Sequence, residues 1–288
     1  MMNEASRFFP ALRVHSWGGL GSQLFTAQLI LKLKHRFPHR KIKVIVHTAG
    51  VTRREAEFDF KTLGVKVKQI EDFSFRDKKS RGEVSFDKFQ TGFFLLIKHL
   101  GLLILRKFHF IISADDEEQF ALLRIWTFMI RGHYTQLAIE RDIVRELYEL
   151  VSNQEKVSSR DEYKIIVHCR LGDLLKLSQK SPIDALRLDT LLENLNVSPQ
   201  AVLVVTDSTF NEFMEYSTGT RILNNCQHGN FRSFETLQKC IFAQDFIGTS
   251  AKLSLWAAIF RYFLMNMNTY LPEDLIWIKN TGLKAIWY

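Results

Sequence analysis

Cysteine is scarce in this sequence. The 288 residues include three cysteines, Cys169, Cys226 and Cys240, and no two of them form a C-x-x-C pair. Such a set is too small and too scattered for a disulfide framework, and it lacks the spacing of a structural zinc site. The cysteine content therefore excludes a disulfide-stapled secreted domain and fits a reducing compartment.

Long apolar runs are lacking as well. The first ten residues, MMNEASRFFP, do not show a basic segment followed by an apolar one, and no uninterrupted apolar run of about 18 residues follows. These absences argue against a secretory signal and against a membrane-spanning helix. We therefore expect a cytoplasmic protein.

What the sequence contains is a globular balance with an excess of positive charge. Hydrophobic residues make up 46% and charged residues 24%, and 39 basic against 31 acidic side chains give a formal charge of +8. This composition excludes a disordered tail, and a chain of this length normally forms two domains. Positive charge suits nucleic acid, anionic lipid or a nucleotide diphosphate. Because no nucleic-acid-binding signature occurs, we expect no nucleic-acid partner.

Short runs rich in Val and Ile alternate with helix-length segments, which is typical of parallel sheets covered by helices. The expected strands are residues 12–16, 42–47, 65–70, 108–112, 164–168, 202–206, 221–224 and 245–248. The expected helices follow Ser22 and cover residues 116–131, 137–150, 183–195, 234–242 and 253–264. A polar stretch at residues 151–162 separates the two series. The sequence predicts an α/β fold with domains at residues 1–155 and 156–288.

The segment at residues 92–112, GFFLLIKHLGLLILRKFHFII, is strongly apolar but contains basic side chains. One interpretation is a buried helix followed by a core strand. The other is an interfacial helix whose Phe and Leu side chains enter a membrane surface while its basic residues meet lipid phosphates. The second interpretation predicts peripheral contact with the inner face of a plasma membrane.

A glycine-rich loop, WGGLGSQLF at residues 17–25, joins the first expected strand to a helix. Its glycines permit backbone torsions and close approach that other residues do not, and the helix start offers unpaired N–H donors. The loop suits a phosphate or a sugar, although a tight strand-to-helix turn explains it equally well. The binding candidates in this loop are Gly18, Gly19, Gly21, Ser22 and Gln23.

Three further strand ends carry polar groups in the second half. The first ends in His168, Arg170 and Asp173, the second in Asp207, and the third in Thr249 and Ser250, with Ser254 one turn later. Ligands of open parallel sheets bind beyond such carboxyl ends, and an arginine there can hold a diphosphate. Helix capping and a structural Arg-Asp pair remain alternatives for Asp207, Thr249, Ser250 and Asp173. No D-x-D occurs, so we expect no metal site.

The order of these motifs resembles the glycosyltransferase family 11 α-1,2-fucosyltransferases. GGLGSQLF at residues 18–25 resembles the family's G-G-L-G-N-Q-[LM]-F, and GHYTQ at 132–136 is similar to its G-Y-[FW]-Q. HCRLGD at 168–173 resembles H-x-R-R-G-D, TDS at 206–208 matches a strand end F-S-D-D, and residues 250–258 resemble N-S-[ST]-F-S-W-W-[AG]-A. Three positions depart from the pattern: Ser22 and Ser250 replace asparagines, and Leu171 replaces the second arginine.

The resemblance implies a GT-B fold, in which two Rossmann-like domains face a central cleft. The second domain would hold GDP-fucose and the first much of the acceptor side. The implied reaction is metal-free inverting transfer to a hydroxyl of a glycan or of a lipid-linked oligosaccharide, as in O-antigen or capsule synthesis. Arg170 would stabilise the departing diphosphate, and His168 and Asp173 are candidate bases. Because Leu171 removes a cation, another nucleotide sugar or a noncatalytic sugar-binding or membrane-scaffold relative remains an alternative.

Overall fold

The computed structural model describes residues 9–48, 56–70, 100–101, 103–154, 163–172, 174–176, 182–275 and 283–288. Contacts divide the chain into unit 1, Met1–Ala138, and unit 2, Ile139–Tyr288. This division falls earlier than the boundary expected after residue 155. The reason is α6 (Arg141–Gln154), which packs on unit 2, with the ring of Tyr148 5.5 Å from that of Phe260. Most of the expected connection, residues 155–162, lies outside the described residues.

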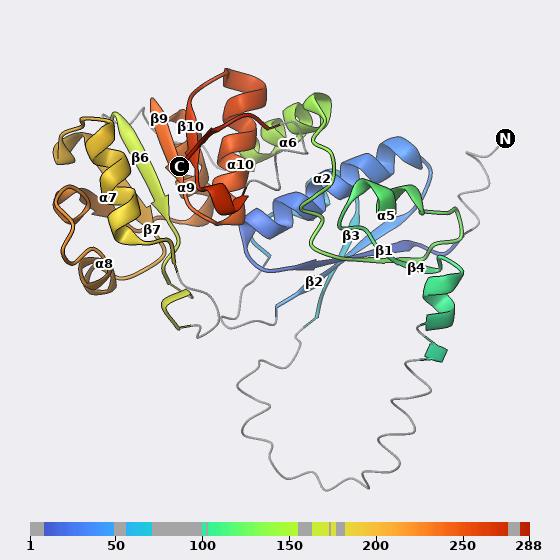
Figure 1. The fold of residues 1–288 in the computed structure, drawn as a ribbon. Coiled ribbons are helices and arrows are strands. Elements are labelled where there is room, and N and C mark those ends of the chain that lie inside the picture. Colours follow the sequence, from blue (N-terminus) through green and yellow to red (C-terminus); the bar gives the residue numbers. More distant parts are fainter. Residues whose placement is uncertain are drawn as a thin grey trace, which may run out of the picture. The chain divides into compact units, whose positions relative to one another are not determined.

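Unit 1 is built on a parallel sheet of five strands in the order β3-β2-β1-β5-β4. The strands are β1 (Leu12–Trp17), β2 (Ile42–His47), β3 (Lys66–Ile70), β4 (Ile111–Ser113) and β5 (Met129–Arg131). Val14, Val44 and Ile130 are paired in register on one face of the central strands, and all three are fully buried. Two helices, α2 (Leu20–Arg36) and α5 (Glu117–Ala121), lie side by side against this sheet, as Figure 1 shows.

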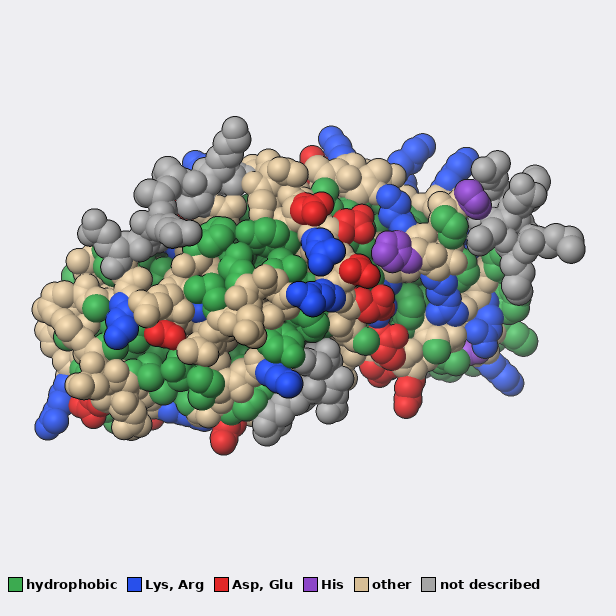
Figure 2. Space-filling view, turned by 90° about the horizontal axis from the view of Figure 1, so that it is seen from above, with side chains coloured by type: hydrophobic (Ala, Val, Ile, Leu, Met, Phe, Trp, Pro, Cys, Tyr) green, Lys and Arg blue, Asp and Glu red, His purple; other side chains and the backbone are tan. Residues whose placement is uncertain are grey.

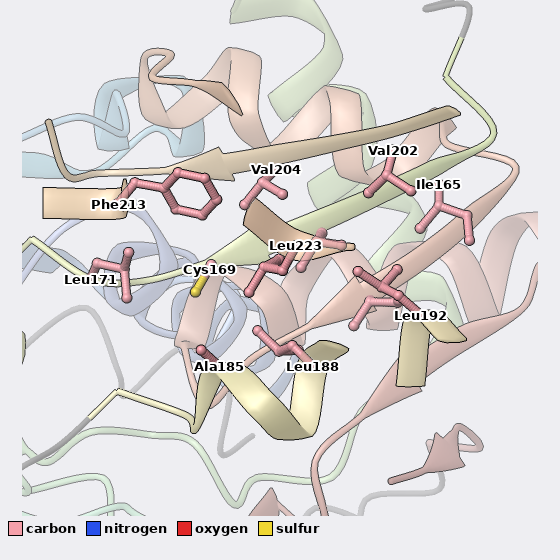
Figure 3. Close-up of a cluster of buried hydrophobic side chains, with 12 residues drawn as sticks. Ile165, Cys169, Leu171, Ala185, Leu188, Leu192, Val202, Val204, Phe213 and Leu223 are labelled. Carbon is pink, nitrogen blue, oxygen red and sulfur yellow. The ribbon is translucent and has the colours of Figure 1, made fainter. Parts of the chain in front are cut away.

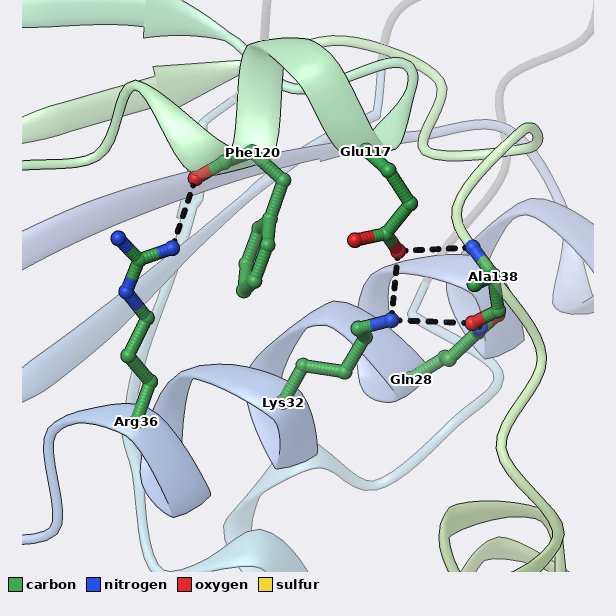
Figure 4. A network of polar contacts seen from close by, with 6 residues as sticks. All are labelled: Gln28, Lys32, Arg36, Glu117, Phe120 and Ala138. Atoms are coloured by element: carbon green, nitrogen blue, oxygen red, sulfur yellow. Dashed lines mark hydrogen bonds and ion pairs between the residues drawn. The ribbon is translucent and has the colours of Figure 1, made fainter.

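A buried lysine joins α2 to α5 (Figure 4). The Lys32 ammonium donates to Glu117 Oε1 at 2.6 Å and to the carbonyl of Ala138 at 3.0 Å. The same Glu117 oxygen accepts the Ala138 amide at 2.8 Å, and Gln28 Nε2 donates to the Ala138 carbonyl at 3.0 Å. One turn later, Arg36 donates to the Phe120 carbonyl at 3.0 Å. These contacts fix the end of unit 1 onto α2.

The helix expected at residues 116–131 is wrong for most of its length. Asp116 caps α5 by accepting the Gln119 amide at 2.8 Å, but α5 ends at Ala121 and β5 begins at Met129. The intervening turn is held from outside, because Arg40 donates to the carbonyls of Ile125 and Thr127. A strand of three residues is too short to show a period of two, so its sequence pattern was hidden.

Unit 2 contains a second parallel sheet of six strands in the order β11-β10-β9-β6-β7-β8. The strands are β6 (Ile165–Cys169), β7 (Val202–Thr206), β8 (Gln227–Gly229), β9 (Asp245–Gly248), β10 (Thr269–Leu271) and β11 (Ile286–Trp287). The helices besides α6 are α7 (Ala185–Asn194), α8 (Phe210–Tyr216), α9 (Ser233–Phe242) and α10 (Lys252–Phe260). Two Rossmann-like parallel α/β units confirm the predicted fold class.

The pleat of β6 separates two packed layers. Ile165, Val167 and Cys169 point into a cluster with α7, α8 and Leu223 (Figure 3). The alternate residue His168 points to the other layer, where its Nδ1 lies 2.7 Å from Ser254 Oγ on α10. Successive side chains of a strand face opposite sides of the sheet, so this alternation follows from β6 being extended.

A buried arginine holds the second layer together. Arg261 is fully buried at the start of a π-helical turn, Arg261–Met265, that continues α10. Its guanidinium donates to six acceptors, among them the carbonyls of Ile241 and Ala243 at the end of α9, at 2.9 and 2.6 Å. The six hydrogen-bond acceptors carry no formal charge, and the carbonyls of Ile241 and Ala243 lie at the negative end of a helix dipole.

Other expectations differ in detail. Residues 221–224 form no strand; Leu223–Asn225 is a 3-10 turn and the strand follows at β8. The expected helix at 137–150 begins later, at Arg141. Residues 100, 101 and 103–107 are helical, while 92–99 lie outside the described residues. Within the described residues, no helix combines the length and apolarity needed to cross a membrane.

Candidate functional site

Three strand ends of unit 2 meet, as the sequence predicts. Neighbouring strands β9, β6 and β7 are parallel, so the residues that follow them lie at one edge of the sheet. The Arg170 amide donates to Thr249 Oγ1 at 3.4 Å, which joins the ends of β6 and β9. The amides of Leu171 and Gly172 both donate to Asp207 Oδ1 at 2.8 Å, which joins the ends of β6 and β7.

Asp207 holds the loop after β6. Gly172 is required at this contact, because a Cβ there would lie 2.7 Å from the Asp207 carbonyl oxygen and 3.0 Å from its carboxylate. One carboxylate oxygen is thus committed to two backbone amides. The structure assigns Asp207 a loop-holding role, and its expected contact with a donor stays a prediction.

His168 and Ser254 lie beneath the same edge. Ser254 is fully buried, shares the hydrogen bond with His168, and accepts the Thr249 amide through Oγ at 3.2 Å. Burial lowers the pKa of His168 to about 4, so the imidazole is neutral at neutral pH. In this arrangement both side chains support Thr249 from inside, and neither is exposed to a ligand.

The β9–α10 junction presents amides and hydroxyls. Thr249 is buried, whereas Ser250 is exposed and its hydroxyl donates to Asp274. The N-cap position of α10, Ala251, has no side-chain hydrogen bond to the helix, and the first turn contains no acidic residue. The first amides of a helix have no acceptor within the helix and favour an anion.

Strand alternation separates Arg170 from Leu171. Leu171 continues the row of Val167 and Cys169 and is fully buried in the cluster against α7. Arg170 falls in the row of His168, which faces α10, and its side chain is half-buried. The position where the resembled family has its second arginine therefore points into the apolar core of this chain.

Sequence reasoning missed Lys252. This half-buried residue is the first of α10 and follows Thr249 and Ser250 at the same edge. Lys252 therefore places a cation at the amino end of a helix, beside the first helix amides. The signal was present in the sequence, since Lys252 stands where the resembled motif has Ser or Thr.

In unit 1 the glycine-rich loop is a tight strand-to-helix turn. Gly18 has φ +82°, and a Cβ there would lie 2.9 Å from Ser22 Oγ. Gly19 caps α2, and Gly21 is buried inside the helix. The buried Gln23 donates to the Gly18 carbonyl at 2.9 Å and accepts the amides of Glu57 and Phe58 at 2.9 and 2.8 Å. Gln23 thus shapes the loop from within.

Aromatic and imidazole rings gather beside this loop. Trp17 stacks on His47 with ring centroids 4.5 Å apart, and His47 Nε2 lies 2.7 Å from His15 Nδ1. Arg131 lies over Trp17 at 5.7 Å. Tyr134, in the GHYTQ element, is buried and donates to the His15 carbonyl at 2.6 Å. The sequence treated both histidines as structural or surface residues and did not predict this stack.

Three expectations about the site remain, and they concern Trp256, Asp173 and a metal site. Trp256 is fully buried beside Phe260, as core packing predicts. Asp173 lies outside the described residues. No group of three or more His, Cys, Asp or Glu suited to a metal ion occurs in the part of the chain that the structure describes. The unit 2 edge combines Arg170, Lys252 and the first amides of α10, and this set of groups suits a diphosphate.

No protein-family model and no curated protein sequence matches the chain. Solved structures are similar at low identity. Escherichia coli heptosyltransferase WaaC with ADP has 10% identity, covering 96% of this chain and 92% of that one with a TM-score of 0.42. A family 9 glycosyl transferase from Veillonella parvula has 9% identity, covering 91% and 80%, with a TM-score of 0.43. NodZ α-1,6-fucosyltransferase soaked with GDP-fucose has 13% identity, covering 87% and 92%, with a TM-score of 0.35. Such TM-scores do not identify the family of this chain.

Proposed function

We propose that this chain is an inverting glycosyltransferase that takes its sugar from a nucleotide diphosphate sugar. The carrying observation is the convergence of Arg170 and Thr249 at the carboxyl edge of the unit 2 sheet, with the start of α10 beside them. The proposal is supported by the order of the motifs, because HCRLGD and the segment from Ser250 to Ala258 meet through the contact of His168 with Ser254.

In this proposal Arg170 and Lys252 share the diphosphate. Arg170 offers a planar fork of N–H donors, which matches phosphate oxygens, while Lys252 offers a compact charge. Lys252 thereby supplies a second cation in place of the arginine that the resembled family has at the position of Leu171. The first amides of α10 donate to the same oxygens.

The reaction is a direct displacement. The oxygen of an acceptor hydroxyl forms a bond to the anomeric carbon while the bond from that carbon to the diphosphate oxygen breaks. The electron pair leaves with the nucleoside diphosphate, where Arg170 and Lys252 stabilise the added charge. The hydroxyl proton passes to solvent or to a base, for which Asp173 remains a candidate. The neutral, buried His168 instead positions Thr249 through Ser254.

The donor we propose first is GDP-fucose, with a hydroxyl of a glycan or lipid-linked oligosaccharide as acceptor and no metal cofactor. Support comes from the motif resemblance at residues 18–25 and 168–173. A different nucleotide sugar is favoured by one observation, the burial of Leu171, because the family's second arginine has no counterpart at that position. The acceptor side is proposed for Gly18, Gly19, Gly21, Ser22 and Gln23, and the location is the cytoplasm.

Isothermal titration with GDP, UDP and CMP tests this proposal, followed by hydrolysis assays with GDP-fucose. We expect one nucleotide diphosphate to bind, and Arg170→Ala to reduce turnover by about two orders of magnitude or more with an unchanged unfolding temperature. The matched control is Arg221→Ala in the same unit, because the side chain of Arg221 is 87% exposed. Near-normal turnover of Arg170→Ala would remove the proposed role of this residue.

A further inference from the structure

A set of large hydrophobic side chains is exposed on unit 1. Among the described residues of the whole chain, eleven large hydrophobic side chains are exposed, and six of them fall in residues 100–108 and 122–126. They are Leu100, Leu103, Ile104, Phe108, Leu122 and Trp126, between 41% and 57% exposed. The other five are scattered through unit 2. Single exposed apolar residues are ordinary, whereas a group of six indicates an interaction surface.

The two segments form one surface because backbone and side-chain contacts join them. Trp126 Nε1 donates to the Phe108 carbonyl at 3.0 Å, and Thr127 Oγ1 donates to the His109 carbonyl at 2.7 Å. The Phe128 amide donates to the Phe110 carbonyl at 3.0 Å, immediately before β4 and β5 begin. The surface therefore lies at the amino ends of these two strands, the opposite edge of the sheet from the Gly18 loop.

The conformation that exposes Phe108 is specified locally. The helical residues 103–107 end with the Phe110 amide bonded to the Leu105 carbonyl and the His109 amide bonded to the Arg106 carbonyl. His109 has φ +57°. Together with the two hydrogen bonds, this torsion makes the helix end a Schellman motif with His109 in the left-handed position. This turn directs the chain into β4 and leaves Ile104 and Phe108 outside. Figure 1 shows the helix close to β4.

The charge of this surface has one sign. Residues 100–113 and 121–131 contain no Asp or Glu, and Arg106, Lys107 and Arg124 are exposed among the apolar side chains. Figure 2 draws a face of the molecule on which acidic side chains occur beside basic and histidine ones, so the single sign of charge is a property of these two segments.

We propose that this surface docks unit 1 onto an anionic lipid bilayer. Phe108, Trp126 and Ile104 enter the headgroup region, and Arg106, Lys107 and Arg124 meet the lipid phosphates. A surface of aromatic and aliphatic side chains with basic and no acidic neighbours matches an interfacial site. The free energy of burying apolar side chains at the acyl boundary and that of attraction to anionic lipid add to each other. A protein partner with an acidic face is the alternative outcome of the test. This inference is independent of the sugar-transfer proposal.

Co-sedimentation with vesicles tests the inference. Phosphatidylcholine vesicles are compared with vesicles that contain about 30% phosphatidylglycerol. Three cations near such a surface predict about 100-fold stronger partitioning to the anionic vesicles, lost at high salt. The double variant Phe108→Ser/Trp126→Ser and the double variant Arg106→Glu/Lys107→Glu should each bind at least tenfold more weakly.

Controls separate docking from folding. Phe210→Ser, at a phenylalanine that is 59% exposed in unit 2, should bind like the original chain. Thermal unfolding is recorded for every variant, and Ile104→Ser provides a milder change on the same helix surface. Equal partitioning to both vesicle types, unchanged binding of both double variants, or no binding to either vesicle would overturn the inference. Nucleotide titration of the same preparations reports on sugar transfer separately.

Discussion

At the residue scale, position 171 distinguishes this chain from the family it resembles. Restoring the arginine by Leu171→Arg places a guanidinium in the buried cluster of Val167 and Cys169. Burying an unpaired charge is costly, so we expect the free energy of unfolding to fall by about 3 kcal/mol or more. Urea unfolding measures this change. Leu186→Arg, at a leucine 57% exposed on α7, should cost about 1 kcal/mol or less.

The affinity of Leu171→Arg for the nucleotide tests whether the side chain of residue 171 faces the core or the strand edge. If the side chain of residue 171 could reach the strand edge, the variant would fold normally and bind the nucleotide more tightly. Such a result would contradict the assignment of the second cation to Lys252. We expect instead that Lys252→Ala weakens nucleotide binding while leaving the unfolding temperature unchanged.

His168 makes stability depend on pH. Burial lowers the pKa of the folded-state imidazole to about 4, below its ordinary value of 6.5. The unfolded chain therefore takes up a proton first as pH falls, so stability present above pH 6.5 decreases toward pH 4. The loss from this residue is about 2 kcal/mol between pH 6.5 and 5.

Urea unfolding of the original chain and of His168→Gln, at both pH values, measures this contribution. The variant should lose about 2 kcal/mol less than the original chain on acidification. His39→Gln, at an exposed histidine, serves as the control and should follow the original chain. Equal slopes for the original chain and His168→Gln would show that His168 titrates normally in the folded state.

At the element scale, Arg261 connects α9, α10 and β10. Arg261→Lys keeps the charge but cannot reach six acceptors, so carbonyls at the end of α9 lose their partners. We expect a loss of about 3 kcal/mol in the free energy of unfolding. Arg221→Lys, with an exposed guanidinium, should be neutral within about 0.5 kcal/mol. A neutral Arg261→Lys would mean that the charge alone holds these elements.

The elements that the sequence predicted well are the long or strongly apolar ones. The runs that form β1, β2, β6, β7 and β9 were placed to within a residue or two, because central strands of parallel sheets are apolar on both faces. The strands β5, β8, β10 and β11 have two or three residues and no readable period. Their positions depend on distant contacts, such as Arg40 with the turn before β5.

The same contrast applies to the candidate site. The meeting of three strand ends in unit 2 could be predicted, because parallel neighbours end at one edge. The role of each residue could not be predicted, since it depends on which side of β6 the residue faces. The motif resemblance aligns Arg170 and Leu171 with two adjacent arginines, and the pleat places these two residues in opposite layers. The stack of Trp17 on His47 requires the register of β1 with β2.

At the scale of the whole molecule, the chain forms two α/β units, and we propose that the strand edge of unit 2 binds a nucleoside diphosphate. The central claim is that Arg170 and Lys252 hold a diphosphate at that edge. The most direct test is isothermal titration of the intact chain, of Arg170→Ala and of Lys252→Ala with GDP, UDP and CMP. We predict that one nucleoside diphosphate binds to the intact chain and that each variant binds it at least tenfold more weakly. Absence of binding by the intact chain, or an affinity of either variant equal to that of the intact chain, would contradict this claim.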